Sequence, residues 1–160
     1  MLSSKSGGKS QSSQLGQMSL KGRALRLLSG REHSRAELEK RLRQYEEAPG
    51  GLAAALDELQ AKGFISEQRV IESVINRRQA KLGSARIRQE LQSKGLDKDA
   101  VIDAVASLQA TELDRARDIW NRKFGEVATD AKERGKQMRF FASRGFSGDV
   151  IRKVMAGETD

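Results

Sequence analysis

The sequence predicts an all-α protein made of tandem three-helix repeats. Its 160 residues include a single proline and only 4% aromatic residues. Ala, Leu, Glu, Arg, Lys and Gln dominate the chain, and all of them have a high helix propensity. Aliphatic residues recur three or four positions apart, which is the period of an amphipathic helix. Glycines end these segments at a nearly regular interval, so we expect about nine helices in three units that form an elongated, curved solenoid-like molecule.

The regular interval sets the expected domain boundaries. Gly95 and Gly145 each follow a helical pattern and lie 50 residues apart, and the apolar Leu91 and Phe141 have the same separation. We therefore predict three-helix repeats at 19–64, 65–110 and 111–157. Residues 1–18 are mainly Ser, Gly, Gln and Lys, which offer little apolar surface to bury, so this segment is predicted to be a disordered tail.

The first repeat shows one pronounced helix-start signal. An apolar stripe over 20–29 predicts the first helix. Ser34 and Glu37 have the spacing of a capping box and predict the start of the second helix, which Pro49 and the two glycines after it are expected to end. The third helix is predicted over 52–62, followed by a glycine suited to a C-terminal cap.

The second repeat has a polar capping residue before each expected helix. Ser66, Ser84 and Asp97 occupy these positions. The first helix is expected to stop at Gly83 and the second at Gly95. The predicted inward-facing residues of the three helices are Val70, Val74, Ile75, Ile87, Leu91, Val101, Val105 and Leu108.

The third repeat is expected to begin with a separate helix from Thr111 to Gly125. Asp130 and Ser147 are placed to cap the two helices that follow. The predicted inward-facing residues are Leu113, Ala116, Trp120, Phe124, Met138, Phe141, Ala142, Val150, Ile151 and Val154. Each repeat has few large apolar side chains, so we expect the repeats to stabilise one another or a partner to stabilise them.

The composition favours a polyanionic partner. A formal net charge of +8 and a pI near 10.0 favour nucleic acid first and an anionic membrane second. The chain has no cysteine, which excludes disulfides, thiol nucleophiles and Cys-ligated zinc. No apolar run is long enough for a bilayer span, and the N-terminus has no signal-peptide core, so a cytoplasmic location is expected. The carboxylates are scattered, without the paired arrangement that acid–base catalysis uses, and we predict a protein that is not an enzyme.

One long segment has a distinctive motif. Residues 63–96, "GFISEQRVIESVINRRQAKLGSARIRQELQSKGL", resemble the core signature of the RecX family of recombinase regulators. Further matches lie at 24–42, 122–126 and 139–151, so the resemblance covers about residues 20–155. The tail before Leu20 is longer than the family pattern. The motif residues are Lys81, Gly83, Arg86, Ile87, Glu90, Leu91, Lys94, Gly95 and Leu96.

The resemblance implies a function and a set of partners. A protein of this family is expected to bind the RecA recombinase and its filament on DNA. It is expected to inhibit ATP hydrolysis, strand exchange and coprotease activity, and so to act in the control of DNA repair, recombination and the SOS response. Single- and double-stranded DNA are expected as weak, non-specific partners. We expect a monomer with no cofactor, no metal and no membrane association.

Basic residues are the candidates for DNA or recombinase contacts. Lysines and arginines near helix C-termini also complement the helix dipole, and Arg86 with Glu90 has the spacing of a structural i, i+4 ion pair. Trp120 and Phe124 are expected to pack in the core, although aromatic rings can also stack on bases, and Tyr45 fits either role. The lone His33 is not expected to bind metal. The candidates are Arg77, Arg78, Lys81, Arg86, Arg88, Lys94, Arg122, Lys123, Arg139, Arg144 and Arg152.

Two other functions remain open at this point. A sequence-selective helix-turn-helix regulator could use helix–Gly–helix steps such as residues 84–109, although such proteins usually carry one recognition helix and a dimerisation element. A metal-dependent hydrolase using scattered carboxylates is the third hypothesis. An effect that depends on the recombinase would distinguish recombinase inhibition from both of these functions.

Overall fold

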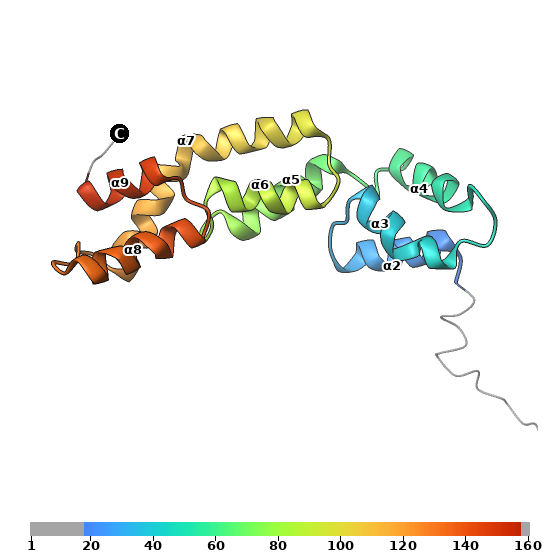
Figure 1. Ribbon diagram of the computed structural model, residues 1–160. Coiled ribbons are helices and arrows are strands. Elements are labelled where there is room, and N and C mark those ends of the chain that lie inside the picture. Colours follow the sequence, from blue (N-terminus) through green and yellow to red (C-terminus); the bar gives the residue numbers. More distant parts are fainter. Residues whose placement is uncertain (1–17, 158–160) are drawn as a thin grey trace, which may run out of the picture. The chain divides into compact units, whose positions relative to one another are not determined.

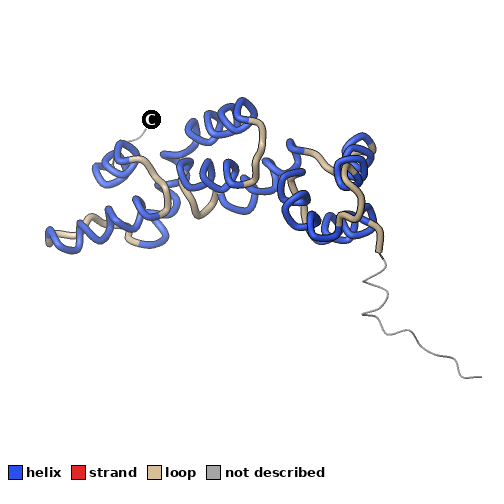
Figure 2. Tube along the Cα trace, turned by 45° about the vertical axis from the view of Figure 1, so that its right-hand side comes forward, coloured by secondary structure: helices blue, strands red, loops and turns tan. Residues whose placement is uncertain are grey.

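All regular structure in the described residues is helical. The computed structural model describes residues 18–157, and within them lie eight α-helices, one 3₁₀ turn and no strand (Figure 2). This confirms the all-α prediction. The tail predicted at 1–18 lies almost wholly outside the described residues. The chain divides into two compact units, residues 1–65 and 66–160.

The first unit is a small three-helix domain. It contains α2 (Leu20–Gly30), α3 (Arg35–Leu42), the 3₁₀ turn η1 (Arg43–Tyr45) and α4 (Gly51–Ala61) (Figure 1). Its core contains Ala24, Leu38, Leu42, Leu52, Leu56, Leu59 and Ile65. At this size the buried apolar area gives a domain only modest stability.

Local capping explains where the helices of the first unit begin. The Ser34 side chain accepts from the backbone N–H of Glu37, and the Glu37 carboxylate accepts from the backbone N–H of Ser34, so the predicted capping box is confirmed. The predicted end of this helix at Pro49 is wrong, because α3 ends at Leu42 and η1 ends at Tyr45. The loop that follows η1 supplies a hydrogen bond to the start of α4. A Glu46 carboxylate oxygen accepts from the N–H of Leu52 at 2.8 Å.

The second unit holds the other five helices. They are α5 (Glu67–Arg78), α6 (Ser84–Ser93), α7 (Lys98–Lys123), α8 (Ala131–Ser143) and α9 (Gly148–Ala156). The predicted caps Ser66, Asp97, Asp130 and Ser147 each accept a hydrogen bond from the first turn of the following helix. These caps are local features, and the sequence located all four correctly.

The long helix α7 corrects one expectation. We expected one helix to end near Gln109 and a second to begin at Thr111, but α7 runs for 26 residues across that boundary (Figure 1). No Gly or Pro lies between Lys98 and Lys123 to break it. Its first half packs Val101, Val105 and Leu108 into one apolar core, and its second half packs Leu113, Ala116, Ile119 and Trp120 into another.

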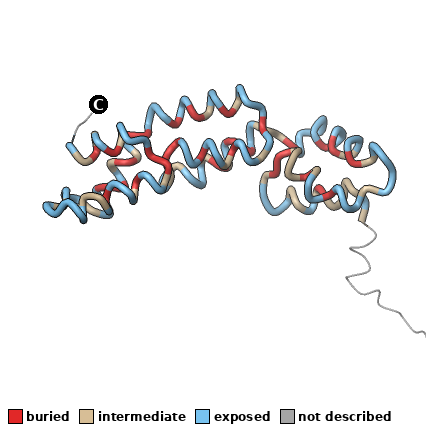
Figure 3. The backbone as a smooth tube through the Cα atoms, in the orientation of Figure 1, coloured by how far each residue is buried: buried red, intermediate tan, exposed pale blue. Residues whose placement is uncertain are grey.

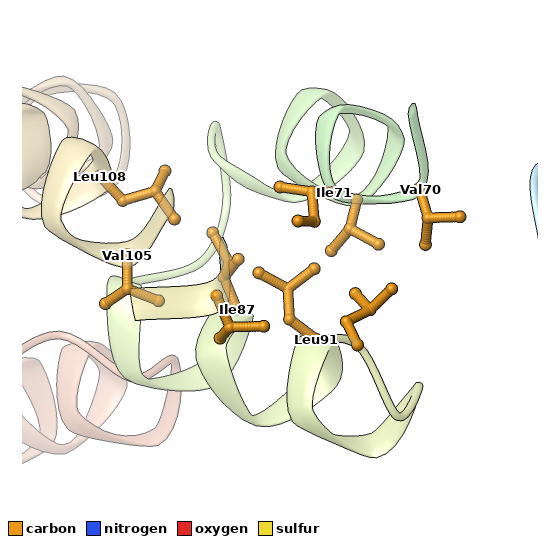
Figure 4. Packing of buried hydrophobic residues seen from close by; sticks show 9 residues of the cluster. Val70, Ile71, Ile87, Leu91, Val105 and Leu108 are labelled. Atoms are coloured by element: carbon orange, nitrogen blue, oxygen red, sulfur yellow. The ribbon is translucent and has the colours of Figure 1, made fainter. Parts of the chain in front are cut away.

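Each core of the second unit is built by three helices. In the first, Val70 and Ile71 of α5 face Leu91 of α6, and residues of α7 complete the cluster (Figure 4). Ile87 and Leu91 are fully buried, as the sequence predicted. Buried residues follow one side of each helix, while the opposite side is exposed (Figure 3).

The start of α6 is bound by the buried carboxylate of Glu112 and not by the predicted serine cap. Gly83 is the N-cap residue and has no side chain to offer. The Glu112 carboxylate of α7 accepts from the backbone N–H of Ser84 at 3.4 Å and from its hydroxyl at 3.1 Å. Ser84 and Glu112 are both buried. The prediction that Ser84 caps this helix was therefore wrong, and Ser84 is itself held by a residue distant in sequence.

Backbone hydrogen bonds join the two halves of the second unit. The N–H of Gly83 donates to the carbonyl of Arg144 at 2.8 Å, and the N–H of Ala85 donates to the carbonyl of Gly145 at 3.2 Å. Gly145 has φ of +87°, a conformation that favours glycine. The start of α6 thus packs directly on the α8–α9 turn.

The buried face of α8 also differs from the expectation. Met138 is 50% exposed and Ala142 is exposed, whereas Phe141 is fully buried. Gln137 is buried beside Phe141, and its amide donates to the carbonyl of Glu126 at 3.0 Å while accepting from the N–H of Ala128 at 3.1 Å. Because the amide oxygen and the amide nitrogen of Gln137 each have a hydrogen-bond partner, the cost of burying this polar side chain is offset.

Within residues 18–157, no helix is both long and apolar enough to cross a bilayer.

Candidate nucleoprotein interface

All eleven candidate basic residues lie in the second unit. Nine of them are exposed, and Lys94 and Arg144 are partly buried. They are spread over the five helices of this unit and the turns that follow them. Three of them, Arg86, Lys123 and Arg144, are brought together around Phe140 and Ser143.

This group, the Phe140 cluster, consists of Arg86, Lys123, Phe140, Ser143 and Arg144. The Arg144 guanidinium lies 3.6 Å from the centroid of the Phe140 ring, and the Lys123 ammonium lies 4.5 Å from the same centroid. Both distances are within the range of cation–π attraction. Three elements supply the cations: the first half of α6, the end of α7 and the end of α8.

The Arg86 side chain joins the cluster through a hydrogen bond to a backbone carbonyl. Its Nη1 donates to the Ser143 carbonyl at 2.9 Å, and the Arg144 Nη1 donates to the Phe140 carbonyl at 3.2 Å. The ion pair expected between Arg86 and Glu90 was wrong, because Glu90 instead accepts from Arg78 of α5 at 3.1 Å. Arg86 therefore holds the junction of α6 and α8 while it adds positive charge there.

The remaining candidates are dispersed. Arg77 and Arg122 each donate to a carbonyl one turn earlier in their own helix, and Arg152 pairs with Asp149 at 2.6 Å. Arg88 borders a recess that Ser84, Glu112 and Gly145 also line. The other exposed or partly exposed candidates are Lys81, Lys94 and Arg139.

Arg115 was not among the predicted residues, and its role is structural. Its Nη1 donates to the carbonyls of Gln79 and Leu82 at 2.9 and 2.8 Å, so it caps the C-terminal end of α5. Burial lowers the pKa of Arg115, an effect that the neighbouring Glu112 opposes. Nothing in the local sequence separates this arginine from its exposed neighbours, because the two carbonyls that it caps are more than 30 residues away.

The aromatic residues near the cluster pack among themselves. Trp120 is 6% exposed, and its ring centroid lies 5.4 Å from that of Phe124 and 6.2 Å from that of Phe141. The expectation of core packing for Trp120 and Phe124 is confirmed. Phe140 extends this aromatic core to the surface, with its ring edge-on to Phe124 and a centroid distance of 5.4 Å.

Among residues 18–157, no three metal-ligating side chains lie together. His33 is 2% exposed, and its Nδ1 lies 3.0 Å from the carbonyl of Arg31. Burial is the main cause that lowers the pKa of His33. The histidine is thus a buried residue of the first unit.

Comparison with known proteins decides the family. Family models of the first, second and third three-helix domains of RecX match residues 21–59, 66–105 and 110–155. The regulatory protein RecX of Leptothrix cholodnii is 53% identical over 139 residues, which cover 87% of this chain and 88% of the relative. The chain belongs to the RecX family. RecX of Herminiimonas arsenicoxydans is 47% identical and covers 90% of this chain and 95% of that relative.

Solved RecX structures share the fold. A crystal structure of regulatory protein RecX superposes with a TM-score of 0.69 at 19% identity, covering 87% of this chain and 72% of that one. RecX from Lactobacillus salivarius gives 0.70 at 20% identity, covering 86% of this chain and 93% of that one. The family resemblance and the three-helix-domain fold predicted from the sequence are therefore both confirmed. The relatives are named as regulatory proteins, so a regulatory role within this family follows.

Proposed function

We propose that this RecX-family protein binds RecA and its filament on DNA and inhibits the recombinase without catalysing a reaction of its own. It would restrain ATP hydrolysis, strand exchange and coprotease activity in the cytoplasm, and so act in the control of DNA repair and recombination. The observation that carries the proposal is the ordered set of three RecX domains over residues 21–155. The expected partners are RecA, its filament and, more weakly, DNA alone.

The Phe140 cluster is the part of the predicted basic set best placed for a shared contact. Lys123 and Arg144 both lie over one ring and Arg86 is hydrogen-bonded beside them, so their positive charges lie near one another. A phosphodiester backbone or an acidic protein surface would meet several cations at once. If phosphates are contacted, affinity falls as salt rises, because each contact releases counterions.

The first test is ATP hydrolysis by RecA on single-stranded DNA with this protein titrated in. The proposal expects strong inhibition well below one protein per RecA monomer, since action on filament ends or on filament disassembly affects many monomers. No inhibition in excess protein, together with intact binding to a selected DNA sequence, would overturn the proposal in favour of a sequence-selective DNA regulator.

A pair of matched variants tests the Phe140 cluster itself. Lys123→Gln with Arg144→Gln removes two positive charges from the cluster. Lys98→Gln with Lys132→Gln removes the same charge from exposed first-turn positions of α7 and α8, where cations oppose the helix dipole. Inhibition should weaken several-fold in the first variant and stay unchanged in the second. Equal effects would mean that only net charge matters and would remove the cluster from the mechanism.

A further inference from the structure

The first unit contains a basic cleft that the sequence did not single out. It lies between α2, the end of α3 and η1, and has a volume of about 410 Å³, which is within the usual range of small-ligand sites. Arg23, Arg26, Leu27 and Gly30 line one side, at the i, i+3, i+4, i+7 spacing of a single helix face. The residues opposite and at the ends are Arg41, Leu42, Gln44, Tyr45 and Met18.

The charges that line this cleft are all positive. Three arginines line it and no carboxylate does. Four acidic residues of this unit form ion pairs with residues that do not line the cleft: Glu37 pairs with Arg31, Glu39 and Asp57 pair with Arg35, and Glu58 pairs with Lys21 and Lys62. No carboxylate within residues 18–157 forms an ion pair with the side chain of Arg26 or Arg41.

An aromatic ring lies at the edge of the same cleft. Tyr45 is 41% exposed, and the Arg23 guanidinium lies 3.7 Å from its ring centroid. This distance corresponds to a stacked arginine–aromatic pair. Leu27 and Leu42 supply apolar surface beside it, and the Gln44 amide supplies hydrogen-bonding groups. An aromatic surface in a cleft that Arg26 and Arg41 also line fits a ligand that has both a flat ring and an anion.

We propose that this cleft binds a segment of single-stranded nucleic acid, with a base stacked on the Arg23–Tyr45 pair and flanking phosphates held by Arg26 and Arg41. Bases stack on aromatic and guanidinium planes without strong sequence preference, and arginine matches phosphate geometry with two parallel donors. An acidic peptide would use the arginines but would place no flat ring on the Arg23–Tyr45 pair. The site lies in the first unit and the Phe140 cluster lies in the second, and the site stands on its own observations whether or not RecA is the regulated protein.

Fluorescence anisotropy of a short labelled oligothymidylate, with the full chain and no RecA, tests the proposal. Arg26→Ala with Arg41→Ala should weaken binding at least about tenfold and reduce the slope of log affinity against log salt by about 1.4, since each phosphate contact on a single strand contributes roughly 0.7. Lys40→Ala with Arg43→Ala is the matched control, because both residues are exposed in the same unit and neither lines the cleft. Its affinity and salt slope should change much less.

Variants of the ring separate base stacking from charge. Tyr45→Ala should lower the affinity about tenfold and Tyr45→Phe should preserve it, because only the first removes the stacking surface. With an abasic oligonucleotide of equal length, both Tyr45 variants should bind like the unaltered chain. Equal binding of abasic and thymine probes, or tighter binding of polyglutamate than of DNA, would overturn the base-stacking site.

The result is also separable from the proposed function. If the cleft variants bind oligothymidylate like the unaltered chain while Lys123→Gln with Arg144→Gln abolishes binding, the cleft proposal fails and the Phe140 cluster is supported. Loss of binding only in the cleft variants supports the cleft, even if RecA is not inhibited. Thermal melting followed by circular dichroism shows which variants are folded, and Tyr45→Phe provides a minimal change if Tyr45→Ala does not fold.

Discussion

Replacing Gly83 by alanine tests whether the α6 start is held against the α8–α9 turn. A Cβ atom at this position would overlap the carbonyl group of Gly145 and lie 2.5 Å from the backbone nitrogen of Phe146. These are backbone atoms that no side-chain rotation can move. The start of α6 would have to separate from the turn, and the hydrogen bonds that Gly83 and Ala85 donate would lengthen or break.

The expected cost follows from these contacts. Two backbone hydrogen bonds contribute about 1 kcal/mol each, and overpacking typically costs about 1–3 kcal/mol. Alanine recovers about 0.4–1 kcal/mol by restricting the unfolded chain, because the φ of −80° at Gly83 suits any residue. The free energy of unfolding should therefore fall by about 3 kcal/mol, a large part of the total for a domain of this size.

Urea unfolding followed by the fluorescence of Trp120 measures this change. Trp120 is the only tryptophan and is buried in the core that Phe146 also joins. Gly148→Ala is the control, because a Cβ there meets nothing within 4 Å and Gly148 is the first residue of α9. The control should be as stable as the unaltered chain or slightly more stable. A Gly83→Ala protein within about 0.5 kcal/mol of the unaltered chain would refute the rigid junction, since surface substitutions also stay in that range.

Three further predictions concern buried or paired groups. Glu112→Ala should lower the free energy of unfolding by about 2 kcal/mol in urea titrations, because it leaves buried donors at the start of α6 unpaired; no measurable loss would contradict this. Hydrogen bonds from Lys21 and Lys62 lower the pKa of Glu58 to about 2, so stabilisation from this group is present above its unfolded pKa and is lost as the pH falls toward 2. Lys21→Met should raise the pKa of Glu58 in an NMR titration, and an unchanged value would contradict the pairing. Burial lowers the pKa of His33, so the folded state binds fewer protons than the unfolded state near pH 6 and stability should fall as the pH drops below about 6.5. His33→Gln should flatten this dependence in urea titrations between pH 7 and 5, and an equal slope in both proteins would contradict the assignment.

Several features of the fold were predictable because they depend on neighbouring residues. Ser34, Ser66 and Asp97 each precede a helical pattern, and each accepts a hydrogen bond from the backbone of the next turn. Leu91 and Ile87 are four residues apart and share the buried face of α6. Caps and stripes extend over one or two helical turns, so the residues that define them are close together in the sequence.

The sequence-based predictions failed where residues far apart in the chain determine which polar groups are hydrogen-bonded and buried. Ser84 has the type and position of a helix cap, yet Glu112 holds it from the neighbouring helix. Met138 is more apolar than Gln137, but the loop before α8 supplies backbone partners that make the glutamine suitable for burial. The predicted break within α7 was a different kind of error. The absence of Gly and Pro from residues 98–123 was visible in the sequence, but the break was placed there to fit the assumed repeat boundary.

The candidate sites divide in the same way. The sequence identified the positive charge of the chain and named Lys123, Arg144 and Arg86, but it could not show that they gather at Phe140. It missed the cleft of the first unit, because Arg23 and Tyr45 are 22 residues apart and only their packing makes a stacked pair.

By itself, the sequence determined the helical class, most helix starts, the family and the sign of the charge, since these depend on composition and on short-range spacing. The tertiary structure decided which cations share a surface, which polar groups are buried and which glycines allow two backbones to meet. Those properties depend on distances between residues that are far apart in the chain, and packing alone sets such distances.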